Sequence, residues 1–230
     1  MNFKSILSDF IGLFYPDVCI ICGNTLNSSE QHLCLECLNR MPRTGYHKIK
    51  NNLLEKRFWG KADIFRGTAL FHFQKGSPFQ KMLHELKYKG NQELGEYLGR
   101  LAAVEIITVP DFQNIDFIVP IPLHPNKYAK RGYNQSECIA KGISAILNKP
   151  VESTNLIRVV ETATQTRKNV FERYENVSEI FKINEIKLFQ NKHLLVVDDV
   201  LTTGSTIESA VSTLKKCEQV KISVLTLAIA

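Results

Sequence analysis

The sequence predicts an α/β fold in which a parallel sheet is flanked by helices, with a small four-cysteine segment at the N-terminus. Short apolar runs alternate with amphipathic stretches of helical period, which is typical of an α/β domain. Two C-x2-C pairs lie near the N-terminus, and one late apolar run ends in two acids before a hydroxyl-rich turn. With 230 residues, 44% of them hydrophobic, the chain is long enough for one medium domain and a small appendage.

The four N-terminal cysteines have the spacing of a metal site. They follow the pattern C-x2-C-x11-C-x2-C and are Cys19, Cys22, Cys34 and Cys37. Two such knuckles can place four thiolates around one tetrahedral Zn²⁺, with no open position for chemistry. We therefore expect a structural zinc that staples a segment too small for a core of its own. Two disulfides or an iron–sulfur cluster are the alternatives.

The cysteine segment also sets the expected domain division. Apolar residues at helical spacing across positions 3–14 predict a short amphipathic helix, which either packs on the domain or docks to a membrane or partner. We expect residues 1–45 to hold this helix and the zinc knuckle, and residues 46–230 to form the main domain. No run of 18 apolar residues occurs, so we expect no membrane span and a cytoplasmic location. Cys138 and Cys217 are expected on helices as buried apolar residues.

The middle of the chain predicts two strands separated by two helices. The first strand covers residues 68–73, and the helix after it has Ser77 as its N-cap and Pro78 at its first position. A second amphipathic helix is centred on residues 94–102, and a buried strand covers residues 115–121.

A cationic loop follows that strand, from Pro122 to Gln135, and a further helix starts near Asn134. A loop of this kind, past the carboxyl end of a strand, is where an α/β sheet places its ligand; a merely solvated basic loop is the alternative. Residues 156–160 then predict another strand. The polar segment after it predicts a mobile loop, whose candidate donors to phosphate oxygens are Thr162, Gln165, Arg167, Lys168 and Asn169.

Residues 193–206 carry the most specific pattern in the chain. A buried strand ends in Asp198 and Asp199, a hydroxyl-rich turn follows, and an amphipathic helix begins near Ile207. The start of a helix offers free N–H groups to a phosphate, and Gly204 lets the backbone approach it closely. The paired acids can accept hydrogen bonds from ribose hydroxyls and hold Mg²⁺ beside a pyrophosphate. An ordinary capped turn is the alternative.

The charge distribution indicates an anionic partner. The chain has a net charge of +6, and residues 40–100 contain 13 Lys and Arg against 5 Asp and Glu. Four aromatics in this stretch are candidates for stacking on single-stranded DNA, with core packing as their alternative role: Phe58, Trp59, Tyr88 and Tyr97. A solvated basic face is the alternative explanation of the charge.

These motifs together resemble a known family. LLVVDDVLTTGST at 194–206 resembles the signature of type I phosphoribosyltransferases that binds 5-phosphoribosyl-1-pyrophosphate (PRPP). With the cysteine knuckle, LKYKG at 86–90, PIPLH at 120–124 and RGYNQ at 131–135, the whole chain resembles the ComF (ComFC/GntX-like) family. That family is associated with DNA uptake and natural transformation, or competence.

The resemblance implies a role for each motif. The PRPP site would consist of Asp198, Asp199, Val200, Leu201, Thr202, Thr203, Gly204, Ser205 and Thr206, with the two acids on ribose and Mg²⁺. The pyrophosphate loop would contribute His124, Arg131, Gly132, Asn134 and Gln135, and residues 161–169 would form the flexible closing loop. A hood would come from about residues 46–105. Arg131 and Arg167 would join the two acids in catalysis.

The expected function is Mg²⁺-dependent transfer or recognition of phosphoribosyl groups in DNA uptake. Transfer, a pentosyl glycosyltransferase reaction, displaces pyrophosphate from C1 through an oxocarbenium-like transition state, so catalysis would be mostly charge placement. The alternative is a non-catalytic module that binds PRPP and single-stranded DNA. A third reading is a scaffold for a competence helicase or other DNA-processing proteins.

Overall fold

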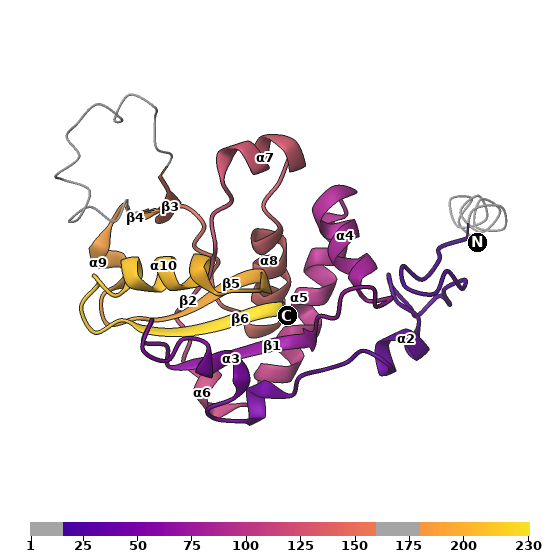
Figure 1. Cartoon of the computed structure of the whole chain (residues 1–230), viewed down its shortest axis with the longest axis horizontal. Helices are drawn as coiled ribbons and strands as arrows, with labels where there is room; N and C mark the ends of the chain where they lie inside the picture. The colour runs from indigo at the N-terminus through magenta and orange to yellow at the C-terminus, as the bar shows by residue number, and fades with distance from the viewer. Residues whose placement is uncertain (1–15, 160–179) are drawn as a thin grey trace.

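A four-stranded parallel sheet forms the centre of the computed structural model, which describes residues 16–159 and 180–230 (Figure 1). Its strand order is β1-β6-β5-β2, and the bounds are β1 Arg66–His72, β6 Lys221–Ile229, β5 His193–Leu201 and β2 Phe117–Pro120. All three neighbouring pairs run parallel, so the four carboxyl ends lie along one edge of the sheet. The parallel sheet predicted from the sequence is confirmed.

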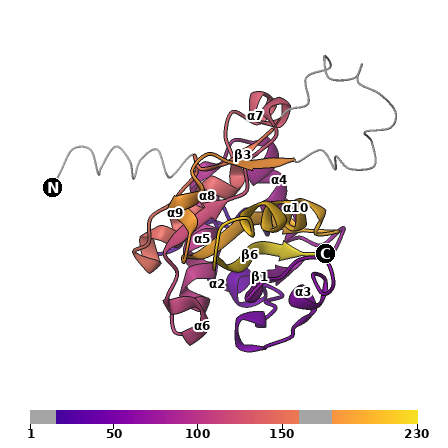
Figure 2. The same ribbon diagram turned by 90° about the vertical axis from the view of Figure 1, so that its left-hand side faces the viewer.

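Helices cover both faces of this sheet (Figures 1 and 2). Side chains alternate along β5, so Leu195 and Val197 pack into one core cluster while Leu194 and Val196 pack into the other. The first cluster contains the buried faces of α5 (Gln92–Ile106) and α8 (Gln135–Leu147), and the second contains that of α10 (Ser205–Leu214). The sheet is therefore buried on both faces, which explains why its strands are continuous apolar runs.

Helices α5 and α8 approach each other more closely than side chains would allow. A Cβ atom on Gly99 of α5 would overlap the carbonyl oxygen of Ile139, and one on Gly142 of α8 would overlap the carbonyl oxygen of Glu96. Glycine at these two positions thus permits backbone-to-backbone contact. This contact fixes α8, whose first turn lies next to the candidate site.

The remaining elements are short. They are α2 Leu35–Asn39, η1 Tyr46–Lys48, α3 Leu53–Lys56, α4 Gln80–Tyr88, α6 Pro110–Gln113, α7 Pro125–Arg131, β3 Leu156–Arg158, β4 Phe181–Ile183 and α9 Ile186–Phe189. Strands β3 and β4 pair antiparallel in a separate two-stranded sheet. No helix among residues 16–159 and 180–230 is both long enough and apolar enough to cross a membrane.

Two predicted segments differ from the structure. The helix expected to start at Ser77 and Pro78 begins instead at Gln80, because the carbonyl of Ser77 accepts from the Gln80 N–H at 3.0 Å in a preceding turn. The segment from Pro122 to Gln135 is not a continuous loop, since it contains helix α7. Pro125 occupies the first turn of α7, where a proline starts a helix without losing a hydrogen bond.

The remaining expectations about the fold are confirmed in part, contradicted in part or left untested. Cys138 is a buried residue of α8 as predicted, whereas Cys217 is buried in the turn after α10 rather than on a helix. The helix predicted for positions 3–14 lies outside the described residues. The division at residue 45 and the hood over 46–105 remain predictions, and within that range β1 belongs to the central sheet.

Candidate functional site

The two acids of the late apolar run lie near the carboxyl end of β5, two residues further inside the strand than predicted. Asp198 is half-buried, and its Oδ1 accepts hydrogen bonds at 2.9 Å from the Ser136 hydroxyl and at 2.9 Å from the Asp199 N–H. Burial of the carboxyl group, followed by the neighbouring charge of Asp199, raises the pKa of Asp198 to about 7. The two neighbouring carboxylates therefore repel each other, and a bound cation would stabilise their charged forms.

Helix α4 supplies one cation to this pair. Lys87 lies in its last turn, and the Lys87 Nζ is 3.1 Å from Oδ2 of Asp199. The two side chains retain 24% and 14% of their exposure, so the ion pair is only partly shielded from water. The LKYKG motif thus contacts the acid pair directly.

The RGYNQ motif lies against the same helix. The Tyr133 hydroxyl donates to the carbonyl of Leu86, and the Arg131 guanidinium is 5.8 Å from the centroid of the Tyr88 ring. The Arg131 Nη1 also donates to the Gln135 side chain at 2.6 Å. Three motifs that are far apart in the sequence therefore meet at one edge of the sheet.

The turn after β5 has the form expected of an anion cradle. Gly204 is the N-cap of α10 with φ of 88°, a left-handed conformation that suits glycine. Thr202, Thr203 and Ser205 are exposed around it, and the Thr203 and Ser205 hydroxyls are 3.2 Å apart. Hydroxyls and the start of a ten-residue helix therefore face solvent together, as a phosphate site requires.

Two contributors to this site were missed by sequence reasoning. Arg57 follows α3 and donates to the carbonyls of Thr202 and Ala230, which anchors the turn to the C-terminal strand. Ser136, in the first turn of α8, holds Asp198. No local pattern marks Arg57, since 145 residues separate it from Thr202. Ser136 directly follows RGYNQ, so an extension of that motif by one residue was the available signal.

The predicted pyrophosphate residues have mixed surroundings. His124 caps α7 by accepting from the Asn126 N–H, and Gly132 ends that helix at φ of 78°. Asn134 donates to the Ile121 carbonyl at 3.0 Å, and the buried Gln135 donates to the Tyr133 carbonyl. Arg131 is the arginine of this set. Its guanidinium group is partly exposed and lies over the Tyr88 ring. The predicted closing-loop residues lie outside the described residues: Thr162, Gln165, Arg167, Lys168 and Asn169.

The four N-terminal cysteines form a compact cluster whose sulfur atoms all lie within 4.8 Å of one another. The Cys22 and Cys34 sulfurs are 3.7 Å apart, and a tetrahedron of 2.3 Å zinc–sulfur bonds has edges of about 3.8 Å. Burial would raise the pKa of Cys19, but backbone N–H groups, from Cys22 first, outweigh it and lower that pKa to about 6. All six cysteines of the chain are free thiols, so the disulfide alternative is not supported and the residues fit a metal ion.

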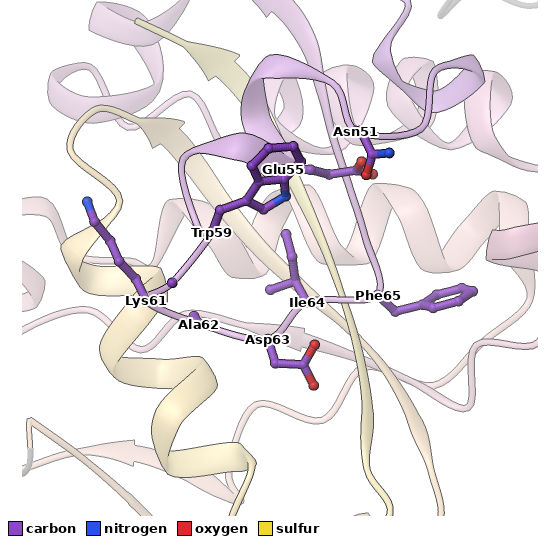
Figure 3. A pocket seen from close by; sticks show the side chains of 9 residues that line it. Asn51, Glu55, Trp59, Lys61, Ala62, Asp63, Ile64 and Phe65 are labelled. Atoms are coloured by element: carbon purple, nitrogen blue, oxygen red, sulfur yellow. The ribbon is translucent and has the colours of Figure 1, made fainter.

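A separate hollow of about 510 Å³ lies along residues 51–65 (Figure 3). Trp59, 60% exposed, and Phe65 line it, and the Lys56 ammonium is 5.8 Å from the Trp59 ring. Asp63 on its rim pairs with Lys215 at the C-terminal end of α10, so this hollow is distinct from the turn at the start of α10. No predicted PRPP residue lines it.

Comparison with known proteins links the site to a named family. The phosphoribosyl transferase domain matches residues 134–228, a range that holds α8, the acid pair, the turn and α10. "DNA utilization protein YhgH" of Salmonella typhimurium strain LT2 is 30% identical over 205 residues, which is 85% of this chain and 89% of that protein. "Competence protein F" of Haemophilus influenzae is 25% identical over 231 residues, 94% of this chain and 98% of that protein.

Among solved structures, a glutamine PRPP amidotransferase from B. subtilis aligns with a TM-score of 0.44 and 17% identity. The alignment covers 62% of this chain and 30% of that one. The relatives, by contrast, match over nearly their whole length and the domain match contains the acid pair. The chain therefore belongs to the ComF family of competence and DNA utilization proteins, which carry a phosphoribosyl transferase domain.

Proposed function

We propose that the chain binds PRPP together with Mg²⁺ at the carboxyl edge of its sheet and acts in DNA uptake or DNA utilization. One observation carries this proposal: Asp198 and Asp199 lie near the end of β5, and only Val200 and Leu201 separate them from the exposed hydroxyl turn that opens helix α10. The names of the relatives, which refer to competence and DNA utilization, support the pathway.

The turn would hold the 5-phosphate of the ligand. N–H groups in the first turn of a helix lack intrahelical partners and carry partial positive charge, which stabilises a phosphate dianion. Thr202, Thr203 and Ser205 add hydroxyl donors from the exposed side. Arg57 holds the turn in place by donating to the main-chain carbonyl of Thr202, so less conformational entropy is lost when the turn binds a ligand.

The acid pair would meet the ribose hydroxyls and Mg²⁺. Carboxylate oxygens are the ligands that Mg²⁺ prefers, and two adjacent carboxylates fit it. Magnesium, when bound, would offset part of the negative charge of the pyrophosphate. Ser136 orients Asp198 by donating to its Oδ1, which leaves the rest of that carboxylate available to the ligand.

If the bound ligand reacts, a nucleophilic atom of an acceptor molecule would form a bond to C1 of the ribose as the C1–O bond to pyrophosphate breaks. Arg131 would stabilise the leaving group, and Arg167 or Lys168 would join it from the closing loop. The four-cysteine cluster would hold a structural zinc away from this chemistry, because all its ligands come from protein.

The experiment that tests this function combines binding with product analysis. Calorimetry with PRPP and Mg²⁺ tests binding by the wild-type chain. Incubation with PRPP, Mg²⁺ and a metabolite extract then tests transfer, which requires released pyrophosphate and a new ribosylated mass. Binding without either product identifies a recognition module rather than a transferase. No binding at any magnesium concentration contradicts the proposal.

Single-stranded DNA binding is a second candidate function. It is favoured by two exposed aromatics that each lie beside a cation, Trp59 beside Lys56 and Tyr88 beside Arg131. Phe58 takes no part, because it is only 1% exposed in the core. Several basic residues of the 40–100 stretch also pair internally, such as buried Arg66 with Glu55. DNA affinity that does not fall steeply with salt removes this candidate.

A further inference from the structure

Among the described residues, Lys87 is the only lysine whose ammonium group lies within ion-pair distance of Asp198 or Asp199. A lysine on a surface helix would gain little from an exposed carboxylate, yet this one reaches a residue at the mouth of the candidate ligand site. The PRPP site proposed above gives Lys87 no part in binding the ligand. Its position therefore needs a functional explanation.

Helix α4 is held firmly enough to aim this side chain. Near its start, the Lys81 Nζ donates to the Ile21 carbonyl at 2.8 Å, inside the first cysteine knuckle. At its end, the carbonyl of Leu86 accepts from the Tyr133 hydroxyl. Leu86 itself is fully buried. The backbone of Lys87 is thus anchored, while its flexible four-carbon stem leaves the ammonium group free to move.

The charges at the site indicate when it would move. Without ligand, Asp198 and Asp199 repel each other, and Lys87 offsets that repulsion at 3.1 Å from Asp199. With Mg²⁺ held by Asp198 and Asp199, the two added positive charges would disfavour the Lys87 ammonium at this position. The pyrophosphate of the same ligand carries more negative charge than one Mg²⁺ neutralises, and it is the natural new partner for a lysine.

We propose that Lys87 changes its ion-pair partner when the ligand binds. In the empty site its ammonium group pairs with Asp199, and in the complex it pairs with the pyrophosphate group of Mg²⁺–PRPP. The inference rests on the proposed function, because it requires PRPP at the acid pair. It assigns Lys87 of the LKYKG motif, and not Lys89, to pyrophosphate recognition. It also predicts that Lys87 discriminates between phosphoribosyl ligands with and without a pyrophosphate.

Two ligands separate this role from a structural one. Mg²⁺–PRPP and Mg²⁺–ribose 5-phosphate share the sugar and the 5-phosphate, but only PRPP carries pyrophosphate. For Lys87→Met we expect PRPP affinity to fall about 10- to 100-fold, the range for a lost charge-assisted hydrogen bond. Ribose 5-phosphate affinity should stay equal or rise, because the variant removes a competitor for Asp199. Lys87→Arg should restore most of the PRPP affinity.

Lys89→Met is the matched control. Lys89 lies two residues away in the same motif, is 60% exposed at its side chain, and pairs with Glu85 on the surface. Its loss should leave both affinities within about twofold of wild type.

The affinities of these variants for the two ligands test the proposed exchange of Lys87 from Asp199 to pyrophosphate. A fall for PRPP alone, with rescue by arginine, supports the exchange. An equal fall for both ligands, or no fall for PRPP, overturns it while PRPP binding by the wild type still stands. Wild-type protein that binds neither ligand overturns the proposed function, and the role of Lys87 falls with it.

Discussion

The hydroxyl of Ser136 donates to Oδ1 of Asp198 at 2.9 Å, and this contact joins the first turn of α8 to the end of β5. It connects residues that are 62 positions apart and fixes one of the two carboxylates expected to meet the ligand. The close contact between α5 and α8 holds the donor in place. The precision of the site therefore depends on helix packing as much as on the loop.

Replacing Ser136 with alanine should weaken Mg²⁺–PRPP binding about tenfold, because Asp198 loses a donor that orients it and stabilises its charge. Calorimetry measures the change. Ser144→Ala is the control, since Ser144 lies on the same helix and its hydroxyl donates to the Lys149 carbonyl at the far end. Equal effects of the two substitutions would show that α8, not the contact to Asp198, is responsible.

Replacing Arg57 with glutamine should also weaken PRPP binding, by about three- to tenfold, because the turn would lose its anchors at Thr202 and Ala230. The chain should remain folded, with a loss of stability of about 1 kcal/mol. Arg40→Gln is a control on an exposed arginine that pairs with Glu36 on the surface. Unchanged affinity in Arg57→Gln would mean that the turn is rigid without this residue.

Two glycines of α5 should differ sharply when changed to alanine. A Cβ on Gly99 meets the backbone carbonyl of Ile139, which cannot move without shifting α8. A Cβ on Gly95 would approach the Cys138 Cβ to 2.8 Å and the Leu86 Cδ1 to 2.9 Å, a smaller overlap than at Gly99, and the end of the Leu86 side chain can move. We expect Gly99→Ala to cost about 3 kcal/mol or more and Gly95→Ala less than about 2 kcal/mol in urea unfolding. Similar losses would contradict the close packing of α5 on α8.

Acidification should destabilise the fold through His193. Burial, followed by the charge of Lys221, lowers the pKa of His193 to about 4. As pH falls, His193 takes up its proton in the unfolded chain before it does so in the folded chain. The contribution of neutral His193 to the free energy of unfolding is therefore complete above about pH 6.5 and is lost as pH falls toward 4. The slope should approach ~1.4 kcal/mol per pH unit. His193→Gln, which keeps a partner for the Ser223 hydroxyl, should flatten the slope. An unchanged slope would exclude His193 as its cause.

Purified protein should contain about one zinc per chain, because the sulfur spacing of the four cysteines matches a tetrahedral site. Elemental analysis gives the ratio. Cys22→Ser should lose the metal and destabilise the N-terminal segment, whereas Cys217→Ala should keep it, since Cys217 lies outside the cluster. About one iron per chain would favour the iron–sulfur alternative over zinc. Protein that contains neither zinc nor iron would contradict a metal site.

Local patterns predicted the parts of the site that are contiguous in sequence. The order of strand, acids, turn and helix around Asp198 and Gly204 follows from apolar period and turn chemistry, which act within a few residues. The contacts of Lys87 and Arg57 could not be predicted, because they depend on how distant elements pack. The prolines around His124 predict an interrupted backbone, but Pro125 occupies the first turn of α7, where a proline can start a helix.

The central claim is that Asp198 and Asp199 hold PRPP, and one calorimetric comparison tests it most directly. Titrate Mg²⁺–PRPP into wild-type protein and into the Asp198→Asn, Asp199→Asn double variant, with circular dichroism to establish that the variant is folded. We predict that the wild type binds and that the folded double variant shows no measurable binding, because the ribose hydroxyls and Mg²⁺ lose their charged acceptors. Unchanged affinity in the folded double variant would contradict the account.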